Sequence, residues 1–345
     1  MPRPGPVRWL TLLLAIAPLL ACGHVPTPVD ESGNEIPRLA RDHVLTDDGQ
    51  RLPLHHHEPQ GTPRAVVLAL HGFGDYSAAF QVLAEPFAAA GIALYAYDQR
   101  GFGATAQPGH WAGEARMVAD ARMVARLLRQ RYPDIPLYLV GESMGGAVTL
   151  LALVEEPDLP VDGAVLMAPA IWARETMPWY QRLGLRVLAR IAPGLQVTGN
   201  AARRLGIRPT DDPEVDRALS LDPLVQKRFR IQTLDGLARL MDAALEAAPR
   251  LPGPALLLYG DQDLISPARP FCALLERLPD PGGQAWRMAL YPGGYHMLTR
   301  YTGAARTHQD LVAWLLDREA ALPSGEEVDR DEARLRMCNS GNQGQ

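Results

Sequence analysis

Six short apolar runs recur along this chain, separated by segments in which apolar residues have a helical spacing. In one such segment, Glu114 to Arg131, apolar side chains return every three or four residues, which indicates an amphipathic helix. Strands that alternate with helices predict an α/β fold with a parallel sheet, because helices then cover both faces of the sheet. The apolar runs are residues 65–70, 92–97, 137–140, 164–167, 255–259 and 286–291.

The alternation is interrupted once, between Ala170 and about Arg250, where no comparable apolar run occurs. We expect a helical cap inserted there, at about residues 171–232. A returning helix over residues 233–248 should then lead into the later strands.

The two ends of the domain have different signals. Asp48-Gly49 divides residues 43–54 and is a strong indication of a two-residue hairpin. Residues 38–320 are therefore expected to form the α/β domain, with the cap as its insertion. Residues 321–345 are polar and contain glycine, which favours a disordered tail.

Residues 1–21 have the pattern of a secretory signal peptide, with a 12-residue apolar stretch that is too short to span a bilayer. The sequence Leu19-Leu20-Ala21-Cys22 resembles the bacterial lipobox, so we expect Cys22 to carry the lipid of a membrane-anchored lipoprotein. By the same resemblance, Gly23 favours the outer membrane, with the folded domain facing the periplasm. Residues 22–37 would be the tether. The alternative is a plain secreted protein cleaved near Ala21.

Composition and charge exclude several classes of protein. The formal net charge of −5 lacks the basic character of a nucleic-acid-binding domain. Three cysteines are too few for a disulfide scaffold or a Cys-rich zinc site. Neighbouring side chains of a strand point to opposite faces, so the run His55-His56-His57 does not predict a metal site. Cys272 and Cys338 could pair in an oxidising compartment, but Cys338 lies in the expected tail, and no disulfide is predicted.

A nucleophile motif follows the third apolar run. Gly141-Glu142-Ser143-Met144-Gly145-Gly146 stands between that run and the apolar helix expected at residues 147–154. A sharp strand-to-helix turn presents the serine hydroxyl above the sheet, and its glycines let strand and helix approach closely. The helix N-terminus would place N–H groups beside developing negative charge. Ser143 is therefore the predicted nucleophile.

Two backbone N–H groups are candidates for the oxyanion hole. One belongs to Met144, the residue after the nucleophile, and the other comes from the loop after an early strand. The run at residues 65–70 leads into His71-Gly72-Phe73-Gly74-Asp75, a glycine-rich turn that would present the Phe73 N–H. The same turn could equally be an ordinary strand-to-helix connection.

In an α/β fold with this kind of nucleophile turn, a base and an acid should follow the serine in the sequence. Each is expected on a loop after a later strand. His296 follows the last apolar run, whereas the other late histidine, His308, falls within a helical pattern. Asp263 follows the run at residues 255–259 and is the preferred acid, with Asp261 as the alternative. A histidine would activate the serine, and the carboxylate would fix the tautomer of that histidine.

These motifs give the chain a family resemblance. From Arg64 to about Asp317 it resembles the monoacylglycerol lipase and lysophospholipase branch of the α/β-hydrolases, which is also grouped with serine aminopeptidases. The resemblance implies a mostly parallel sheet with a cap over an acyl pocket, and Ser143, Asp263 and His296 as the triad. It also implies that Asp98 and Arg100 hold a loop. The matching segments are residues 71–74, 98–103, 141–146, 222–224, 260–263 and 293–298.

The expected cap is basic. Residues 172–232 hold eleven basic and six acidic residues, a net charge of +5. Arg182, Arg186 and Arg190 form one helical stripe beside Leu183, Val187 and Ile191, so this helix could lie on an anionic lipid surface. The alternative is a solvated face above packed apolar residues. Four further cap residues could line the acyl pocket or form the core of the cap: Trp172, Met177, Trp179 and Tyr180.

The sequence thus predicts a serine carboxylester hydrolase that cleaves a lipid monoester, a monoacylglycerol or lysophospholipid, through an acyl-serine intermediate without metal or organic cofactor. An aminopeptidase of the same superfamily is one alternative, although a basic cap is poorly suited to a substrate ammonium. A noncatalytic envelope lipoprotein is the other, and the complete triad argues against it.

Overall fold

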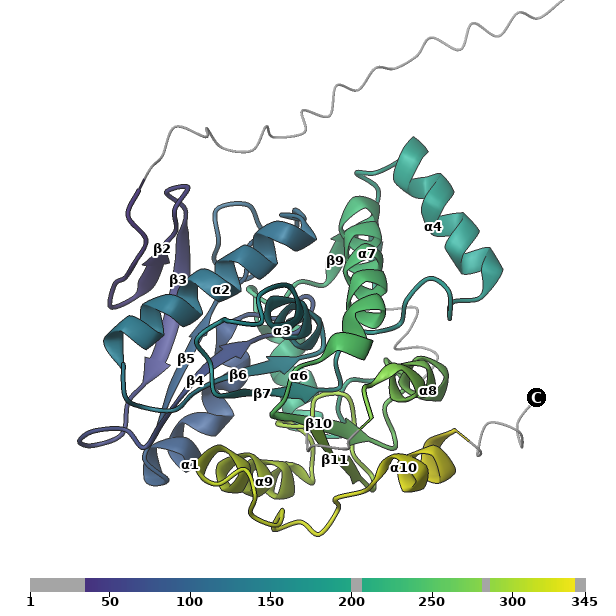
Figure 1. Ribbon diagram of the computed structural model, residues 1–345. Helices are drawn as coiled ribbons and strands as arrows, with labels where there is room; N and C mark the ends of the chain where they lie inside the picture. The colour runs from purple at the N-terminus through teal and green to yellow at the C-terminus, as the bar shows by residue number, and fades with distance from the viewer. Residues whose placement is uncertain (1–34, 200–206, 281–285, 339–345) are drawn as a thin grey trace, which may run out of the picture. The chain divides into compact units, whose positions relative to one another are not determined.

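A parallel sheet with an antiparallel edge organises the computed structural model, which describes residues 35–199, 207–280 and 286–338 (Figure 1). In these residues the main sheet has nine strands in the order β1-β2-β3-β5-β4-β6-β7-β10-β11. The six strands from β5 to β11 in that order are parallel, and β1 to β3 add an antiparallel edge. The antiparallel strands are β1 (Arg38–Leu39), β2 (His43–Leu45) and β3 (Arg51–His57). The parallel strands are β4 (Ala65–Leu70), β5 (Ile92–Tyr97), β6 (Leu137–Glu142), β7 (Gly163–Met167), β10 (Ala255–Gly260) and β11 (Trp286–Tyr291).

The six predicted apolar runs are the six parallel strands, and the α/β-hydrolase fold class is confirmed. Alternate residues of one strand enter the cores on opposite faces of the sheet: in β4, Val66 and Leu68 pack into one core, while Val67 and Ala69 pack into the other. This two-sided burial explains why the runs are continuously apolar.

Helices cover both faces, as Figure 1 shows. One core lies under α2 (Glu114–Arg131), α3 (Met144–Glu155), α7 (Ile231–Ala247) and α8 (Ala268–Arg277). The 3₁₀ turn η2 (Ala248–Arg250) follows α7 directly. The other core lies under η1 (Ser77–Leu83), α1 (Ala84–Ala89) and α9 (Ala304–Leu316). The parallel strands therefore point their carboxyl ends to one edge, where the loops that carry the predicted site residues gather.

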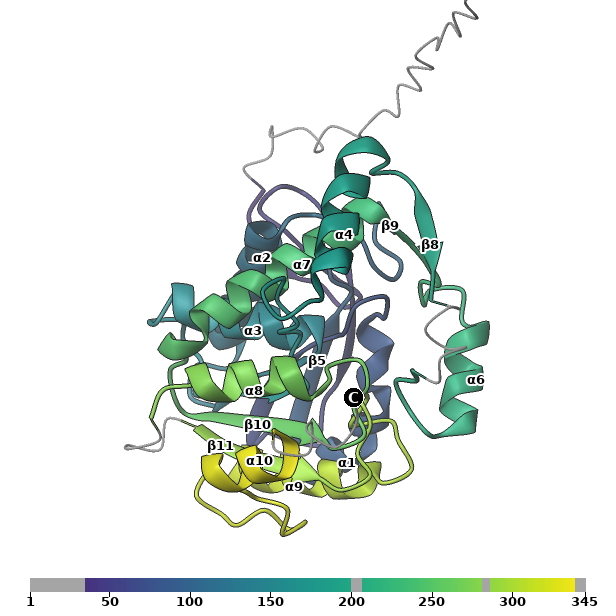
Figure 2. The ribbon, with the colours of Figure 1, turned by 90° about the vertical axis from the view of Figure 1, so that its right-hand side faces the viewer.

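An insertion separates β7 from β10, where the cap was expected at about residues 171–232. It contains α4 (Trp179–Ile191), β8 (Gln196–Thr198), α6 (Pro213–Leu221) and β9 (Arg228–Arg230), which follow one another along one side of the domain in Figure 2. The cap is not purely helical, because β8 and β9 pair antiparallel with Val197 opposite Phe229. Both strands are only three residues long and largely polar, so their sequence gives little strand signal.

The expectation of a disordered tail is wrong for residues 321–338. α10 (Arg330–Met337) packs Ala333 and Met337 into the core, and Cys338 forms a disulfide with Cys272, a pairing that the sequence analysis did not predict. Val328 N donates to Met288 O at 2.9 Å, so this segment covers the open edge of β11. The buried apolar residues of this segment are few and lie among charged residues, so its sequence has the polar character of a disordered tail. Residues 339–345 lie outside the described residues.

The amino-terminal predictions also fall outside the described residues. The signal peptide at 1–21, the lipidation site Cys22 and the tether as far as residue 34 are among the residues that the structure does not describe. Over the described ranges, every helix is too short or too polar to cross a bilayer.

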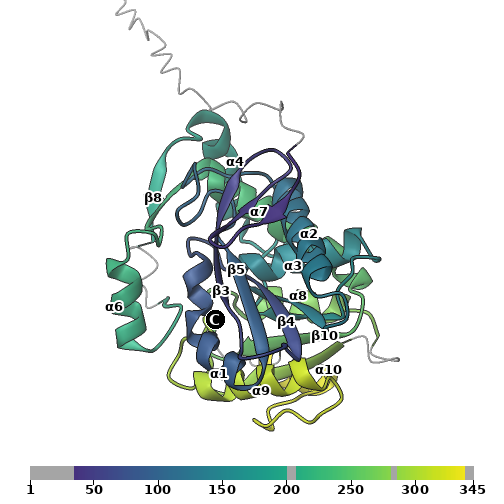
Figure 3. The same ribbon diagram turned by 90° about the vertical axis from the view of Figure 1, so that its left-hand side faces the viewer.

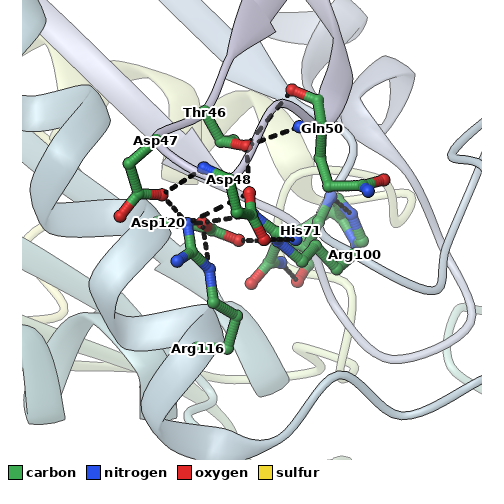
Figure 4. A network of polar contacts seen from close by, with 9 residues as sticks. Thr46, Asp47, Asp48, Gln50, His71, Arg100, Arg116 and Asp120 are labelled. Atoms are coloured by element: carbon green, nitrogen blue, oxygen red, sulfur yellow. Dashed lines mark hydrogen bonds and ion pairs between the residues drawn. The ribbon is translucent and has the colours of Figure 1, made fainter. Parts of the chain in front are cut away.

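A polar network joins the β2–β3 hairpin to the sheet and to α2 (Figure 4). Figure 3 shows the ribbon from the side on which β3, β5 and α2 lie. Arg100, in the loop after β5, donates two hydrogen bonds to Asp48 of the hairpin turn, each 2.7 Å, and two to Asp120 of α2, at 2.5 and 3.1 Å. Arg116 joins the same Asp120 carboxylate to Asp47. Burial favours the neutral form of Asp48, but hydrogen bonds from Arg100 and Thr46 hold its pKa well below the ordinary value. The predicted loop-holding role of Arg100 thus runs through Asp48 and Asp120.

Asp98 holds the same loop separately and does not pair with Arg100. Its carboxylate accepts hydrogen bonds from Ser77 N at 3.0 Å and from Ala104 N at 2.9 Å.

The histidines of β3 have different partners. His55 contacts the Ser77 hydroxyl at 2.6 Å, and His56 stacks on Tyr95. The histidine run therefore diverges within β3, and no metal-binding group of His, Cys, Asp or Glu forms within the described ranges.

Replacement of Arg100 by Met should lower the free energy of unfolding by about 3 kcal/mol, because it leaves the buried Asp120 carboxylate with one partner fewer. Arg126 is a matched control, since its pair with Glu156 is exposed, and Arg126→Met should cost less than about 1 kcal/mol. Equal losses in chemical denaturation of the two variants would contradict the stabilising role of the network.

Candidate active site

Ser143 occupies a strained turn between β6 and α3. Its backbone has φ 53° and ψ −113°, a left-handed conformation that is unusual for a residue with a side chain. A Cβ on Gly145 would lie 1.9 Å from the main-chain oxygen of Leu70, so only glycine permits α3 to begin this close to β4. Ser143 N donates to Met167 O at 2.9 Å, and Ser143 O accepts from Ala170 N at 2.8 Å. The turn is thus fixed from two neighbouring segments.

The loop after β4 lies against the serine. A Cβ on Gly72 would be 3.4 Å from Ser143 Cβ. His71 Nδ1 lies 2.9 Å from Gly72 O, and Gln99 N donates to His71 Nε2 at 2.9 Å. Since Nε2 is the acceptor, Nδ1 carries the proton and donates to Gly72 O. Burial lowers the pKa of His71, which keeps this neutral tautomer at neutral pH.

The His71 hydrogen bond also orients the predicted oxyanion donor. The C=O of Gly72 and the N–H of Phe73 belong to one planar trans peptide and point in opposite directions, so fixing the first fixes the second. In the described part of the chain, the Phe73 N–H has no acceptor. Met144 is the first residue of α3, where the N–H has no acceptor within the helix. Both predicted donors are therefore available beside Ser143.

The cap packs directly onto this loop. The ring of Phe229 in β9 lies 4.7 Å from that of Phe73, measured between centroids, and Gln226 N donates to Gly74 O at 2.8 Å. Phe102 also contacts Phe73, with the two ring centroids 5.5 Å apart. The position of the Phe73 main chain therefore depends on the cap as well as on the sheet.

Asp263 and His296 meet at the carboxyl edge of the sheet. His296 Nδ1 lies 2.7 Å from Asp263 Oδ2, and both side chains are buried. The other oxygen, Oδ1, accepts hydrogen bonds from Ile265 N at 2.8 Å and from Ser266 N at 2.9 Å. The carboxylate is therefore held in place independently of its contact with the ring. Because the carboxylate is an acceptor, Nδ1 carries the proton. Nε2 is buried and has no hydrogen-bond partner among the described residues, which suits a proton acceptor.

The alternatives left open by the sequence occupy other positions. Asp261 is exposed and accepts from Gly293 N at 2.8 Å, so it caps the histidine loop and does not contact the ring. His308, in α9, lies 2.9 Å from Thr299 O. Geometry thus favours Asp263 and His296, and their catalytic roles stay predictions.

The environment of His296 adjusts its basicity. Burial disfavours the charged imidazolium, but the charge and hydrogen bond of Asp263 together outweigh burial and raise the pKa of His296 above its ordinary value. Asp263 therefore both fixes the tautomer and strengthens the base.

A buried ionic group beside the site was missed by the sequence analysis. Arg300 forms ion pairs with Asp75 at 2.7 Å and Glu142 at 2.9 Å. All three residues adjoin predicted motifs: Asp75 ends the glycine-rich turn, Glu142 precedes Ser143, and Arg300 follows His296 by four positions. That adjacency was the available signal, but pairing of residues so distant in sequence cannot be read from the motifs separately.

The structure divides the four predicted pocket residues into two pairs. Trp172 and Met177 are partly buried against the core that contains Met144. Trp179 and Tyr180 are 68% and 59% exposed and contact each other on α4. Their exposure contradicts a place in the core of the cap, while their place in the acyl pocket stays a prediction.

Comparison with known proteins adds the following findings. A family described as serine aminopeptidase, S33, matches residues 61–301. The chain is 29% identical over 298 residues to monoglyceride lipase from Mus musculus, across 82% of this chain and 92% of the relative. It is 30% identical over 276 residues to monoglyceride lipase from Homo sapiens, across 76% and 85%. The crystal structure of Paleococcus ferrophilus monoacylglycerol lipase superposes with a TM-score of 0.63 at 25% identity, covering 78% of this chain and 99% of that one.

Asp263→Asn should reduce kcat on a soluble p-nitrophenyl ester by about 10⁴-fold, because the ring loses its orienting carboxylate. In the wild type, kcat/KM should fall with decreasing pH at a midpoint above about 6.5, since the base must be neutral and its pKa is raised. The residual activity of Asp263→Asn should have a lower midpoint. Asp261→Asn is the control and should keep both properties. An inactive Asp261→Asn beside a normal Asp263→Asn would reverse the assignment.

Proposed function

Because the chain belongs to the serine aminopeptidase S33 family, we propose that it hydrolyses monoacylglycerols as a serine ester hydrolase. The observation that carries this function is the buried Asp263–His296 hydrogen bond, together with the strained turn that presents Ser143. The relatives named monoglyceride lipase in Mus musculus and Homo sapiens support a monoacylglycerol over an aminoacyl substrate. The basic cap, whose charge would repel a substrate ammonium, supports the same choice.

The geometry suggests a two-step cycle. His296 Nε2 takes the proton of Ser143 while Oγ attacks the ester carbonyl, and the N–H groups of Phe73 and Met144 stabilise the oxyanion. Collapse of this intermediate breaks the ester C–O bond, and the imidazolium protonates the departing glycerol oxygen. Water, deprotonated by His296, then attacks the acyl-serine and releases the fatty acid, and the proton returns to Ser143. Every proton donor and acceptor in this cycle belongs to the chain, to the substrate or to water.

We also propose that the mature chain is a lipoprotein of the bacterial envelope, anchored through Cys22 and facing the periplasm. The lipobox-like sequence at residues 19–22 supports this location. The Cys272–Cys338 disulfide, with a Cα–Cα distance of 5.8 Å, supports it independently, because such bonds persist mainly in oxidising compartments.

We propose that one exposed face of α4 rests on the membrane that carries the anchor. This outer face carries Arg182, Arg186 and Arg190 beside Leu183, Val187 and Ile191. The apolar residues of this helix stripe are exposed: Leu183, Val187 and Ile191. They therefore do not pack beneath a solvated face, as the alternative interpretation required. None of Arg182, Arg186 and Arg190 forms an ion pair with a described residue. Exposed apolar side chains beside exposed arginines suit the interface of an anionic bilayer. This contact would bring the cap close to a lipid substrate.

The proposed reaction is tested with a panel of monoacylglycerols, lysophospholipids, short p-nitrophenyl esters and aminoacyl amides, with Ser143→Ala as the blank. Fatty acid should be released from monoacylglycerols by the wild type and not by the blank. Faster release from lysophospholipids would redirect the proposal to that substrate. Activity confined to aminoacyl amides would refute it.

Membrane contact is tested in two stages. Cys22→Ser should move the protein from the membrane fraction of cells to the soluble fraction. In that unanchored form, glutamate at positions 182, 186 and 190 should weaken binding to phosphatidylglycerol vesicles by about 100-fold, since each basic residue near such a surface contributes about 1 kcal/mol. Hydrolysis of a soluble ester should be unchanged. The control places the same charges at the exposed Arg41, Arg51 and Arg250, and equal loss in the control would refute docking through α4.

A further inference from the structure

Three charged side chains are buried together in segments that carry the predicted catalytic residues. Arg300 Nη2 lies 2.7 Å from Asp75 Oδ2 and donates a hydrogen bond of 2.9 Å to Glu142 Oε2. The side chains of Arg300, Asp75 and Glu142 are only 7%, 5% and 2% exposed. Such a group loses most of its hydration, so its charges must be compensated by one another.

Each member belongs to a different segment of the site. Asp75 follows the Phe73 turn by two residues, Glu142 immediately precedes Ser143, and Arg300 lies on the loop that carries His296. One guanidinium therefore connects the loops of the oxyanion donor, the nucleophile and the base. The main chain of Arg300 is itself fixed, because its carbonyl accepts from Thr210 Oγ1 of the cap at 2.6 Å.

Stability alone is a poor explanation for this group. Replacing a buried ionic cluster with apolar residues of similar volume is often neutral or stabilising, because desolvation offsets the attraction. A planar guanidinium between two carboxylates does provide a directional contact that apolar packing cannot supply. The arrangement therefore suits the fixing of distances between loops.

The same group is electrostatically coupled to the base. The charged groups that act on His296 are Asp263 after β10, Glu142 at the end of β6 and Arg300 on its own loop; Glu142 raises the pKa of His296 and Arg300 lowers it. Burial in turn raises the pKa of Glu142. A change in Glu142 should thus be visible in the titration of the base.

We propose that Arg300 is a positioning residue, which holds the loops of Phe73, Ser143 and His296 at their working distances through Asp75 and Glu142. This inference rests on the proposed ester hydrolysis, because it assigns those three loops their catalytic roles. It concerns the alignment of the reacting groups and not the binding of substrate.

The test compares Arg300→Met, Arg300→Lys and Glu142→Gln for thermal midpoint, for kcat and KM on a soluble ester, and for the rate of labelling by a fluorophosphonate. Arg300→Met should lower kcat and the labelling rate by about 100-fold with little change in KM, the loss expected for misalignment of about 1 Å. Arg300→Lys should recover part of this loss. Glu142→Gln should lower kcat less and shift the midpoint of the kcat/KM profile to lower pH.

Arg129 provides the matched control at the opposite ends of the parallel strands, next to the first residues of β6 and β7. It bonds Asp162 at 2.5 Å and the carbonyls of Ile135 at 2.9 Å and Pro160 at 3.1 Å, so it also ties loops together. Arg129→Met should lower the thermal midpoint without changing kcat or the pH profile. An equal fall in kcat in this variant would overturn the positioning role.

Normal kcat and labelling in a folded Arg300→Met variant would overturn the proposal directly. If Arg300→Met fails to fold, Glu142→Gln decides: a folded variant with wild-type kcat and pH midpoint refutes positioning. The fluorophosphonate separates this question from the substrate. A wild type that labels at Ser143 but leaves monoacylglycerol intact refutes the proposed function, while the labelling rates still test Arg300.

Discussion

The close approach of α3 to the end of β4 at Gly145 is the constraint on which the site depends. A side chain there would collide with the main chain of Leu70, so glycine allows the helix to begin directly after Ser143. The serine then adopts a left-handed backbone conformation, and the Met144 N–H lies at the first position of the helix. The same approach brings the Gly72 turn against the serine, so nucleophile and oxyanion donors arise from one packing contact.

Polar contacts fix the remaining parts of the site around this contact. His71 orients the Gly72–Phe73 peptide, Asp263 orients the ring of His296, and Arg300 connects both loops to the nucleophile turn. A second arginine, Arg100, connects the β2–β3 hairpin to α2 in a similar way. The two arginines differ in position: Arg300 lies at the carboxyl edge among the catalytic loops, whereas Arg100 secures the antiparallel edge of the sheet.

Sequence patterns predicted the elements whose burial is determined within one short segment, namely the parallel strands and α2. The parallel strands are continuously apolar, and α2 has the predicted bounds Glu114–Arg131. The positions of Ser143, Asp263 and His296 followed from the order of motifs along the chain. Contacts between distant segments were not predictable: Cys338 reaches Cys272 across 66 residues, and Arg300 reaches Glu142 across 158. For Trp179 and Tyr180 a place in the cap core was wrong, because aromatic residues usually indicate burial, whereas here both side chains are exposed.

The central claim is that Ser143 becomes acylated by a lipid monoester. The direct measurement is peptide mass spectrometry of the enzyme, mixed rapidly with a monoacylglycerol of known chain length and quenched with acid during turnover. The account predicts one acyl group of that chain length on Ser143, and its absence after Ser143→Ala. Continued fatty acid release without acylation of Ser143, or with the acyl group on another residue, would contradict the account.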